Sequence, residues 1–171
     1  MLIALIGFMG SGKSSVGREL ARRLAYSFID TDQEIERKSR MTIPEIFKTY
    51  GEAYFRQLEE EVLVEIIENN KEMVLATGGG IILSESNRSI LREKTTIILL
   101  QAGAEELYNR VREEKNRPLL AVKDPLAEIK RLLAEREDYY NIADLKINTE
   151  GLAVGEIVDL IIEKLFQDKF N

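Results

Sequence analysis

Residues 7–14 match the phosphate-binding pattern G-x-x-x-x-G-K-[ST] and directly follow an apolar run at residues 2–6. A glycine-rich turn between a strand and a helix exposes backbone N–H groups, and the helix N-terminus adds partial positive charge. Such a turn can hold a polyphosphate, with Lys13 reaching the β- and γ-phosphates and the Ser14 hydroxyl binding Mg²⁺. The spacing predicts nucleotide binding, but it does not say what happens to the phosphate.

Two aspartates, Asp30 and Asp32, follow the second predicted strand. Ligands of open α/β sheets sit outside the carboxyl ends of the strands, so both side chains are expected on the rim that carries the phosphate loop. Asp30 can then hold Mg²⁺ through water, and Asp32 can bond a substrate hydroxyl and take its proton. Capping of the following helix explains the same residues equally well when they are taken alone.

Three consecutive glycines, Gly78, Gly79 and Gly80, follow the third predicted strand. Without side chains they let a ligand approach the backbone closely and supply N–H donors. An ordinary turn is the alternative, although three glycines on the active rim favour binding. The usual metal motif, a hydrophobic run ending in Asp, is missing after this strand, which leaves the metal to Asp30.

Two arginines are candidates for a bidentate carboxylate clamp. Arg56 lies three residues before Glu59, which can orient the guanidinium from the same helix face. Arg136 lies in a second predicted helix that ends at Tyr140. For either arginine alone, an ordinary exposed ion pair is the more common explanation, so the clamp depends on the pattern of the whole chain.

A parallel sheet would bring these residues together. Five β-like runs alternate with helical patterns, and the fourth is β-branched and continuous, as is typical of a strand covered on both faces. The alternation predicts a parallel α/β sheet with right-handed crossovers. The five runs are Leu2–Ile6, Ser27–Ile29, Met73–Ala76, Thr95–Leu100 and Leu145–Ile147.

Two stretches interrupt this alternation. The long interval between the second and third strands has helical patterns only, and residues 31–60 are predicted to form a helical insertion for a second substrate. Residues 113–124 lie between two predicted helices and are a candidate mobile lid. No linker divides the chain, so residues 1–171 are expected to form one domain.

The composition argues against several classes of protein. The net charge of −6, from 24 basic and 30 acidic residues, disfavours nucleic-acid and anionic-membrane binding. The chain has no Cys and no His, so base catalysis falls to Asp, Glu or Lys. No run approaches the about 20 apolar residues of a membrane span, and the first residues do not resemble a signal peptide. A cytoplasmic protein is therefore expected.

With these residues in place, the chain resembles the shikimate kinase family. Each shared signature is modest alone, but the set is ordered along nearly the whole chain. The signatures are Gly7–Ser14, Asp30–Asp32 with Ile35 and Glu36, Ile43–Phe47, Gly51–Glu52, Phe55–Glu59, Thr77–Gly80, Arg117–Leu120 and Arg136–Tyr140. One departure is Asn148, where the family's late adenine-loop motif usually has Asp.

The resemblance implies an adenylate-kinase-like P-loop fold with a five-stranded parallel sheet in the order 2-3-1-4-5. It also implies a monomeric phosphotransferase of aromatic amino acid biosynthesis, which uses ATP and Mg²⁺ to phosphorylate the 3-hydroxyl of shikimate. The products are shikimate 3-phosphate and ADP.

The resemblance also assigns the site residues. Asp32, Lys13 and Arg117 are catalytic, Arg117 closes over the phosphates from the lid, and Arg110 stacks on adenine. The metal is held by Ser14 and, through water, by Asp30. The ATP-binding residues are Gly10, Ser11, Gly12, Lys13, Ser14, Ser15, Arg110 and Arg117. The residues that bind shikimate are Asp32, Arg56, Gly78, Gly79, Gly80 and Arg136.

Other functions remain as alternatives. Another small-molecule kinase, for gluconate or a nucleoside monophosphate, would share the loop, but Asp32, Arg56 and Arg136 favour a hydroxylated monocarboxylate. A nucleotide-dependent switch without phosphoryl transfer would typically lack one of these residues or Arg117. A GTPase would need an Asn-Lys-x-Asp element, which the chain does not have.

Overall fold

The computed structural model describes residues 1–112 and 122–167. Its centre is a five-stranded parallel sheet in the order β2-β3-β1-β4-β5. The strands are β1 (Leu2–Ile6), β2 (Ser27–Asp30), β3 (Met73–Ala76), β4 (Thr96–Gln101) and β5 (Leu145–Asn148). The predicted fold class and strand order are confirmed, and each strand boundary lies within one residue of its expected place.

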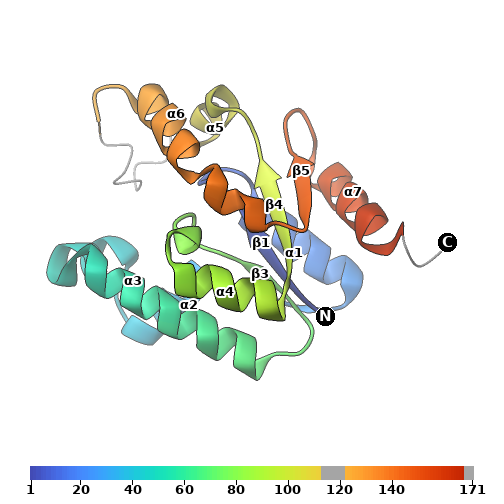
Figure 1. Cartoon of the computed structure of the whole chain (residues 1–171), viewed down its shortest axis with the longest axis horizontal. Coiled ribbons are helices and arrows are strands. Elements are labelled where there is room, and N and C mark those ends of the chain that lie inside the picture. The colour runs from blue at the N-terminus through green and yellow to red at the C-terminus, as the bar shows by residue number, and fades with distance from the viewer. Residues whose placement is uncertain (113–121, 168–171) are drawn as a thin grey trace.

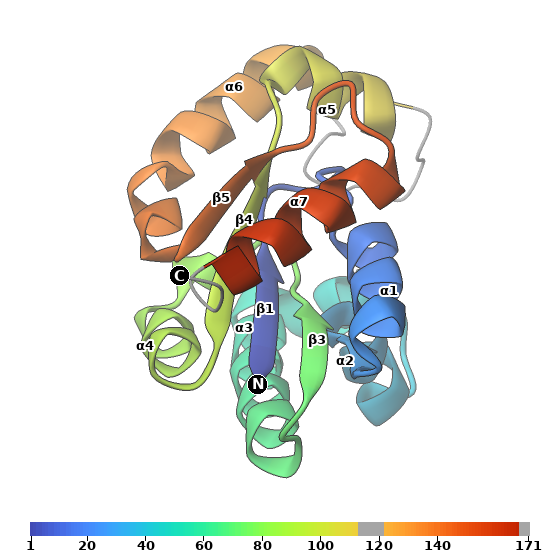
Figure 2. The ribbon, with the colours of Figure 1, turned by 90° about the vertical axis from the view of Figure 1, so that its right-hand side faces the viewer.

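Helices cover both faces of the sheet, as Figure 1 and Figure 2 show. Alternate residues of β1 divide between the two layers: Ile3 and Leu5 belong to one core cluster, and Ala4 and Ile6 to the other. Because the inner strands are buried on both sides, their sequences are continuously apolar. The first layer contains α1 (Lys13–Leu24) and α7 (Val154–Phe166), and the second contains α3 (Ile43–Asn69) and α4 (Glu85–Lys94).

Two further helices lie near the carboxyl ends of the strands (Figure 1). A third core cluster joins Phe8 of the phosphate loop to Leu107, Val111, Ile129 and Leu132. It therefore fixes two helices beside the loop, α5 (Ala104–Val111) and α6 (Pro125–Arg136). The predicted helix through Tyr140 ends at Arg136. The remaining elements are α2 (Thr31–Ser39) and the 3-10 helices η1 (Ile81–Leu83) and η3 (Asp138–Ile142).

The segment between β2 and β3 is helical, as expected, and continues beyond the predicted insertion to Asn69. Thr42 and Glu45 form a capping box that begins α3. Gly51 interrupts this helix with φ 82° and ψ 175°, a conformation that glycine adopts without strain, and the helix is kinked there. The described part of the chain contains no helix long and apolar enough to cross a membrane.

Candidate active site

The phosphate loop connects β1 to α1 through two glycines in left-handed conformations, Gly10 with φ 76° and Gly12 with φ 93°. Other residues would be strained at these positions. Gly12 is the N-cap of α1, and no side-chain hydrogen bond caps this helix end in the described structure. The first N–H groups of α1, together with the helix dipole, can therefore receive an anion.

Lys13 folds back over the loop. Its Nζ donates to the backbone oxygens of Gly7 and Phe8, each at 2.9 Å, and the residue is only 8% exposed. The buried ammonium is thus held beside the amides that would bind phosphate. The backbone of the loop itself fixes the predicted phosphate-binding lysine.

Ser14 and Asp30, the two predicted metal-binding residues, are in contact. Ser14 Oγ donates to Asp30 Oδ2 at 2.7 Å, and Asp30 Oδ1 accepts the N–H of Asp32 at 3.0 Å. Asp30 therefore caps α2 with one oxygen and meets Ser14 with the other, so the two interpretations of this residue are compatible. A hydroxyl and a carboxylate suit Mg²⁺, which usually takes its other ligands from phosphates and water. No cluster of three or more potential metal-binding side chains occurs among the described residues.

Two carboxylates fill the space beside Gly78. A β-carbon on Gly78 would lie 2.6 Å from Asp32 Oδ1 and 2.9 Å from Glu59 Oε1, much closer than van der Waals contact. The Gly78 N–H donates to Thr31 Oγ1 at 2.8 Å, so it is already engaged within the protein. Gly78 thus makes room for the carboxylates of Asp32 and Glu59, whereas the sequence predicted an N–H donor for a ligand.

We expect Gly78→Ala to lower kcat/KM for the acceptor roughly 100-fold, because the added methyl group must displace the short Asp32 side chain. Steady-state kinetics would measure the loss, with a melting curve to verify folding. Gly155→Ala is the matched control, since its new β-carbon would come no closer than 3.4 Å to a neighbouring side chain. Equal activities of the two variants would contradict the expected displacement.

Glu59 supports this arrangement from α3. It is 1% exposed, and its Oε2 accepts Arg56 Nη1 at 2.8 Å. Its Oε1 has no hydrogen-bond partner in the described structure. Burial raises the pKa of the Glu59 carboxyl; the charge of Arg56 opposes this shift, and that of Asp32 adds to it. The predicted orientation of Arg56 by Glu59 is thus present in the geometry.

Because the pKa of Glu59 is raised in the folded protein, we expect its contribution to the free energy of unfolding to depend on pH. Above its ordinary pKa of 4.5, the unfolded carboxyl loses its proton while the native one still holds it, so the free energy of unfolding falls as pH rises. Glu59→Gln cannot titrate. Its free energy of unfolding relative to the wild type should therefore increase from pH 4.5 to neutral pH.

Denaturant titrations at both pH values would measure this change. The control is Glu61→Gln, which removes an exposed carboxylate from the same helix. A difference between wild type and Glu59→Gln that stays constant or decreases with pH would contradict the prediction.

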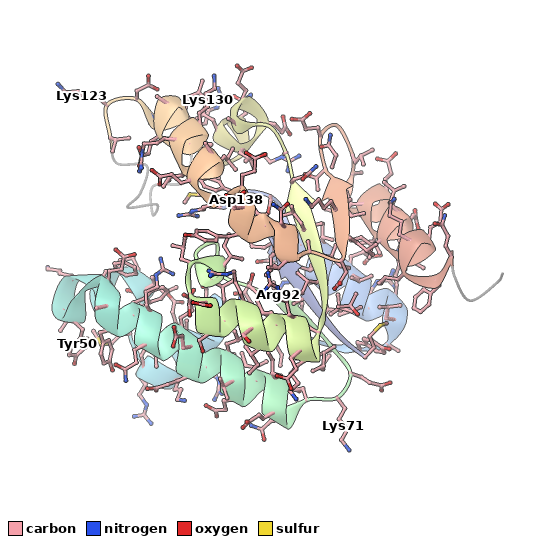
Figure 3. The ribbon with its side chains drawn as sticks, viewed as in Figure 1. Tyr50, Lys71, Arg92, Lys123, Lys130 and Asp138 are labelled. Atoms are coloured by element: carbon pink, nitrogen blue, oxygen red, sulfur yellow. The ribbon has the colours of Figure 1, made fainter. Side chains whose placement is uncertain are left out.

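Arg56 and Arg136 line one cavity of about 490 Å³, although they lie far apart in the sequence. Arg56 lies on α3, the helix that carries Tyr50, and Arg136 is the last residue of α6, two residues before Asp138. Figure 3 labels Tyr50 and Asp138, which mark these two places. The Nη2 of Arg56 also donates to Glu52 at 3.3 Å. The full lining comprises Glu52, Arg56, Leu83, Leu132, Glu135, Arg136 and Tyr139.

The glycine segment also contacts both arginines. Arg136 Nη1 donates to the Gly79 carbonyl at 3.1 Å, and a β-carbon on Gly80 would collide with the Arg56 guanidinium. The segment Gly78–Gly80 therefore lies against three side chains predicted to bind the acceptor, those of Asp32, Arg56 and Arg136. This explains why the site needs small residues after β3.

Arg110 lies between the phosphate loop and the segment after β5. Its Nη1 donates to Thr149 Oγ1 at 3.1 Å, and its Nη2 donates to the Thr149 carbonyl at 3.0 Å. Asn148 Oδ1 accepts the Glu150 N–H at 3.0 Å. An aspartate oxygen could accept the same bond, so Asn148 preserves the local turn.

Several site residues were not found from the sequence. Glu52 could have been found, since it lies four residues before Arg56 on the same helix. Leu132 and Tyr139 could have been found in the same way, since they lie four residues before and three residues after Arg136. Leu83 gave no such signal, because only the tertiary fold brings it to the cavity. Arg117 and most of the predicted lid, residues 113–121, lie outside the described residues.

The sequence comparisons point to one family. A family model described as "Shikimate kinase" matches residues 9–166. The chain is 48% identical over 157 residues to a shikimate kinase of Nitrobacter winogradskyi, covering 92% of this chain and 73% of that protein. It is 43% identical over 162 residues to a shikimate kinase of Thermodesulfovibrio yellowstonii, covering 95% and 93%.

The structural comparison agrees with the sequence comparisons. A solved shikimate kinase from Acinetobacter baumannii, in complex with shikimate, superposes with a TM-score of 0.95 and 39% identity. The superposition covers 99% of this chain and 95% of that one. The chain therefore belongs to the shikimate kinase family of ATP-dependent kinases.

Proposed function

We propose that this chain transfers the γ-phosphoryl group of ATP to the 3-hydroxyl of shikimate, giving shikimate 3-phosphate and ADP. Family membership supports the reaction. One observation supports its location: Asp32, Arg56 and Arg136 gather around Gly78–Gly80, on the same rim as the phosphate loop.

One half of the site, the acceptor half formed by Asp32, Arg56, Arg136 and Gly78–Gly80, would recognise a hydroxylated carboxylate. Arg56 and Arg136 would bind the substrate carboxylate in the shared cavity, where charge-assisted bonds gain strength from partial burial. Asp32 would accept a hydrogen bond from the reacting hydroxyl and then its proton. Gly78–Gly80 would line the substrate ring.

The other half of the site, the donor half formed by the phosphate loop and its neighbours, would bind ATP and the metal. Loop residues Gly10, Ser11, Gly12, Lys13, Ser14 and Ser15 would bind the phosphates. Ser14 and Asp30 would hold Mg²⁺, which when bound would neutralise charge on the β- and γ-phosphates. Arg110 would stack on adenine beside Thr149. Arg117 remains a proposed phosphate-binding residue of the lid.

Catalysis in this site would come mainly from positioning and charge neutralisation. The acceptor oxygen attacks the γ-phosphorus, the bond to the β-phosphate oxygen breaks, and Asp32 receives the hydroxyl proton. Lys13 would turn from the carbonyls of Gly7 and Phe8 toward the phosphate oxygens. Excluding water would prevent wasteful hydrolysis of ATP.

A panel of acceptors tests the assignment against its nearest alternatives. Phosphorylation would be measured with shikimate, gluconate and a nucleoside monophosphate under identical ATP and Mg²⁺ conditions. We expect kcat/KM to be highest for shikimate. Preference for gluconate or a nucleotide would assign the cavity to a different acceptor.

A further inference from the structure

Phe8 lies in the phosphate loop, and its side chain is buried in the apolar core. It is 3% exposed and packs in the cluster that includes Leu107 and Ile129 of the flanking helices. The centre of the Arg136 guanidinium lies 5.3 Å from the centroid of the Phe8 ring. This distance is within the range of about 6 Å at which an aromatic face attracts a cation.

Arg136 has unusual surroundings for a buried cation. It is 5% exposed, yet no carboxylate in the described part of the chain forms an ion pair with it. Arg56, in contrast, pairs with both Glu52 and Glu59. Buried charges are usually paired with an opposite charge. The Arg136 guanidinium can therefore accept an anionic partner from a ligand.

Within the described residues, Arg136 has three neutral groups around it. Besides the Phe8 ring, the Gly79 carbonyl accepts its Nη1 at 3.1 Å. Tyr140 lies nearby: burial raises the pKa of this phenol to about 12, with the Arg136 charge opposing the shift, so the phenol stays neutral at neutral pH. None of these three groups cancels the positive charge of the guanidinium.

We propose that Phe8 is a positioning residue for the substrate carboxylate, because its ring supports Arg136 without neutralising it. A carboxylate in the same place would hold Arg136 more strongly but would compete with the substrate. The aromatic face fixes the guanidinium and leaves its charge available. This inference rests on the proposed binding of the carboxylate by Arg136.

Phe8 also contacts the donor half of the site through its backbone. Its carbonyl accepts Lys13 Nζ at 2.9 Å and the Ser11 N–H at 3.2 Å. The loop that positions the phosphate-binding lysine therefore also positions the support for the acceptor-binding arginine. One residue connects the two halves of the site.

The test compares Phe8→Leu, which removes the ring but stays apolar, with Phe8→Tyr, which keeps an aromatic face. Calorimetric titration with shikimate should show roughly three- to tenfold weaker binding for Phe8→Leu. KM for shikimate should rise by a similar factor and by more than kcat or KM for ATP changes. Phe8→Tyr should recover most of the affinity.

Two controls separate positioning from loss of packing. Ile129→Val truncates the same cluster and should lower the melting temperature without weakening shikimate binding. The methyl ester of shikimate has no charged carboxylate, so its binding should be equally strong to Phe8→Leu and to the wild type.

A double-mutant cycle with Arg136→Ala completes the test. If Phe8 acts through Arg136, Phe8→Leu should cause no further loss of affinity in the Arg136→Ala background. An unchanged affinity in Arg136→Ala alone would overturn the proposed carboxylate role of Arg136. Suppose instead that Arg136→Ala weakens binding. The role of Phe8 alone is then overturned if Phe8→Leu does not change the affinity, or if it lowers the affinity equally in the wild-type and Arg136→Ala backgrounds.

Discussion

Replacing Asp32 by asparagine should lower kcat by about 10²- to 10⁴-fold and leave the affinity for ATP nearly unchanged. Asparagine keeps the size of the side chain and one acceptor oxygen, but it cannot take the proton of the acceptor hydroxyl. Asp32 lies beside Gly78 and Glu59, whereas the predicted phosphate contacts come from the phosphate loop and the first residues of α1. ADP release would give kcat, and calorimetry would give the ATP affinity.

Asp138→Asn is the matched control, because it removes the same charge from an exposed position on η3 (Figure 3). It should retain wild-type turnover. ATP affinity that falls together with kcat in Asp32→Asn would contradict the proposed role, as would a kcat close to that of the wild type.

Arg136→Ala should raise KM for shikimate by roughly 10- to 150-fold, as expected when hydrogen bonds between charged groups are lost. The effect on kcat should be smaller, because the arginine would bind a part of the substrate that does not react. Arg136→Lys should recover only part of the affinity, since lysine cannot form the two parallel bonds of a guanidinium. Initial rates at varied shikimate concentrations would measure these changes.

Arg131→Ala is the control for Arg136→Ala. Arg131 lies on the same helix but is exposed and pairs with Glu128 and Glu135. It should leave KM for shikimate unchanged. If KM were also unchanged in Arg136→Ala, the carboxylate would have to bind elsewhere.

The parts of the molecule that could be predicted from sequence are those with local or periodic signals. The inner strands are continuously apolar because helices cover them on both sides. The phosphate loop combines a short motif with a strand and a helix. Pairing of Arg56 with Glu59 follows from helical spacing. Strand order came from the family resemblance, since no local signal determines it.

The remaining features depend on tertiary contacts. The sequence predicted that Gly78 would donate its N–H to a ligand. In the structure Thr31 accepts this N–H, and Asp32 and Glu59 lie where a β-carbon at position 78 would be. Helical spacing predicts the two ion pairs of Arg56. The support of Arg136 by the Phe8 ring and the Gly79 carbonyl has no sequence signature, because only the tertiary fold makes these contacts. The roles of the site residues and of Arg117 stay predictions.

The most direct measurement is ADP release from ATP and Mg²⁺ by the purified protein, with and without shikimate. The proposed function predicts that release depends strongly on shikimate and that one shikimate 3-phosphate forms for each ADP. ADP release at the same rate without shikimate, or no release in its presence, would contradict the central claim.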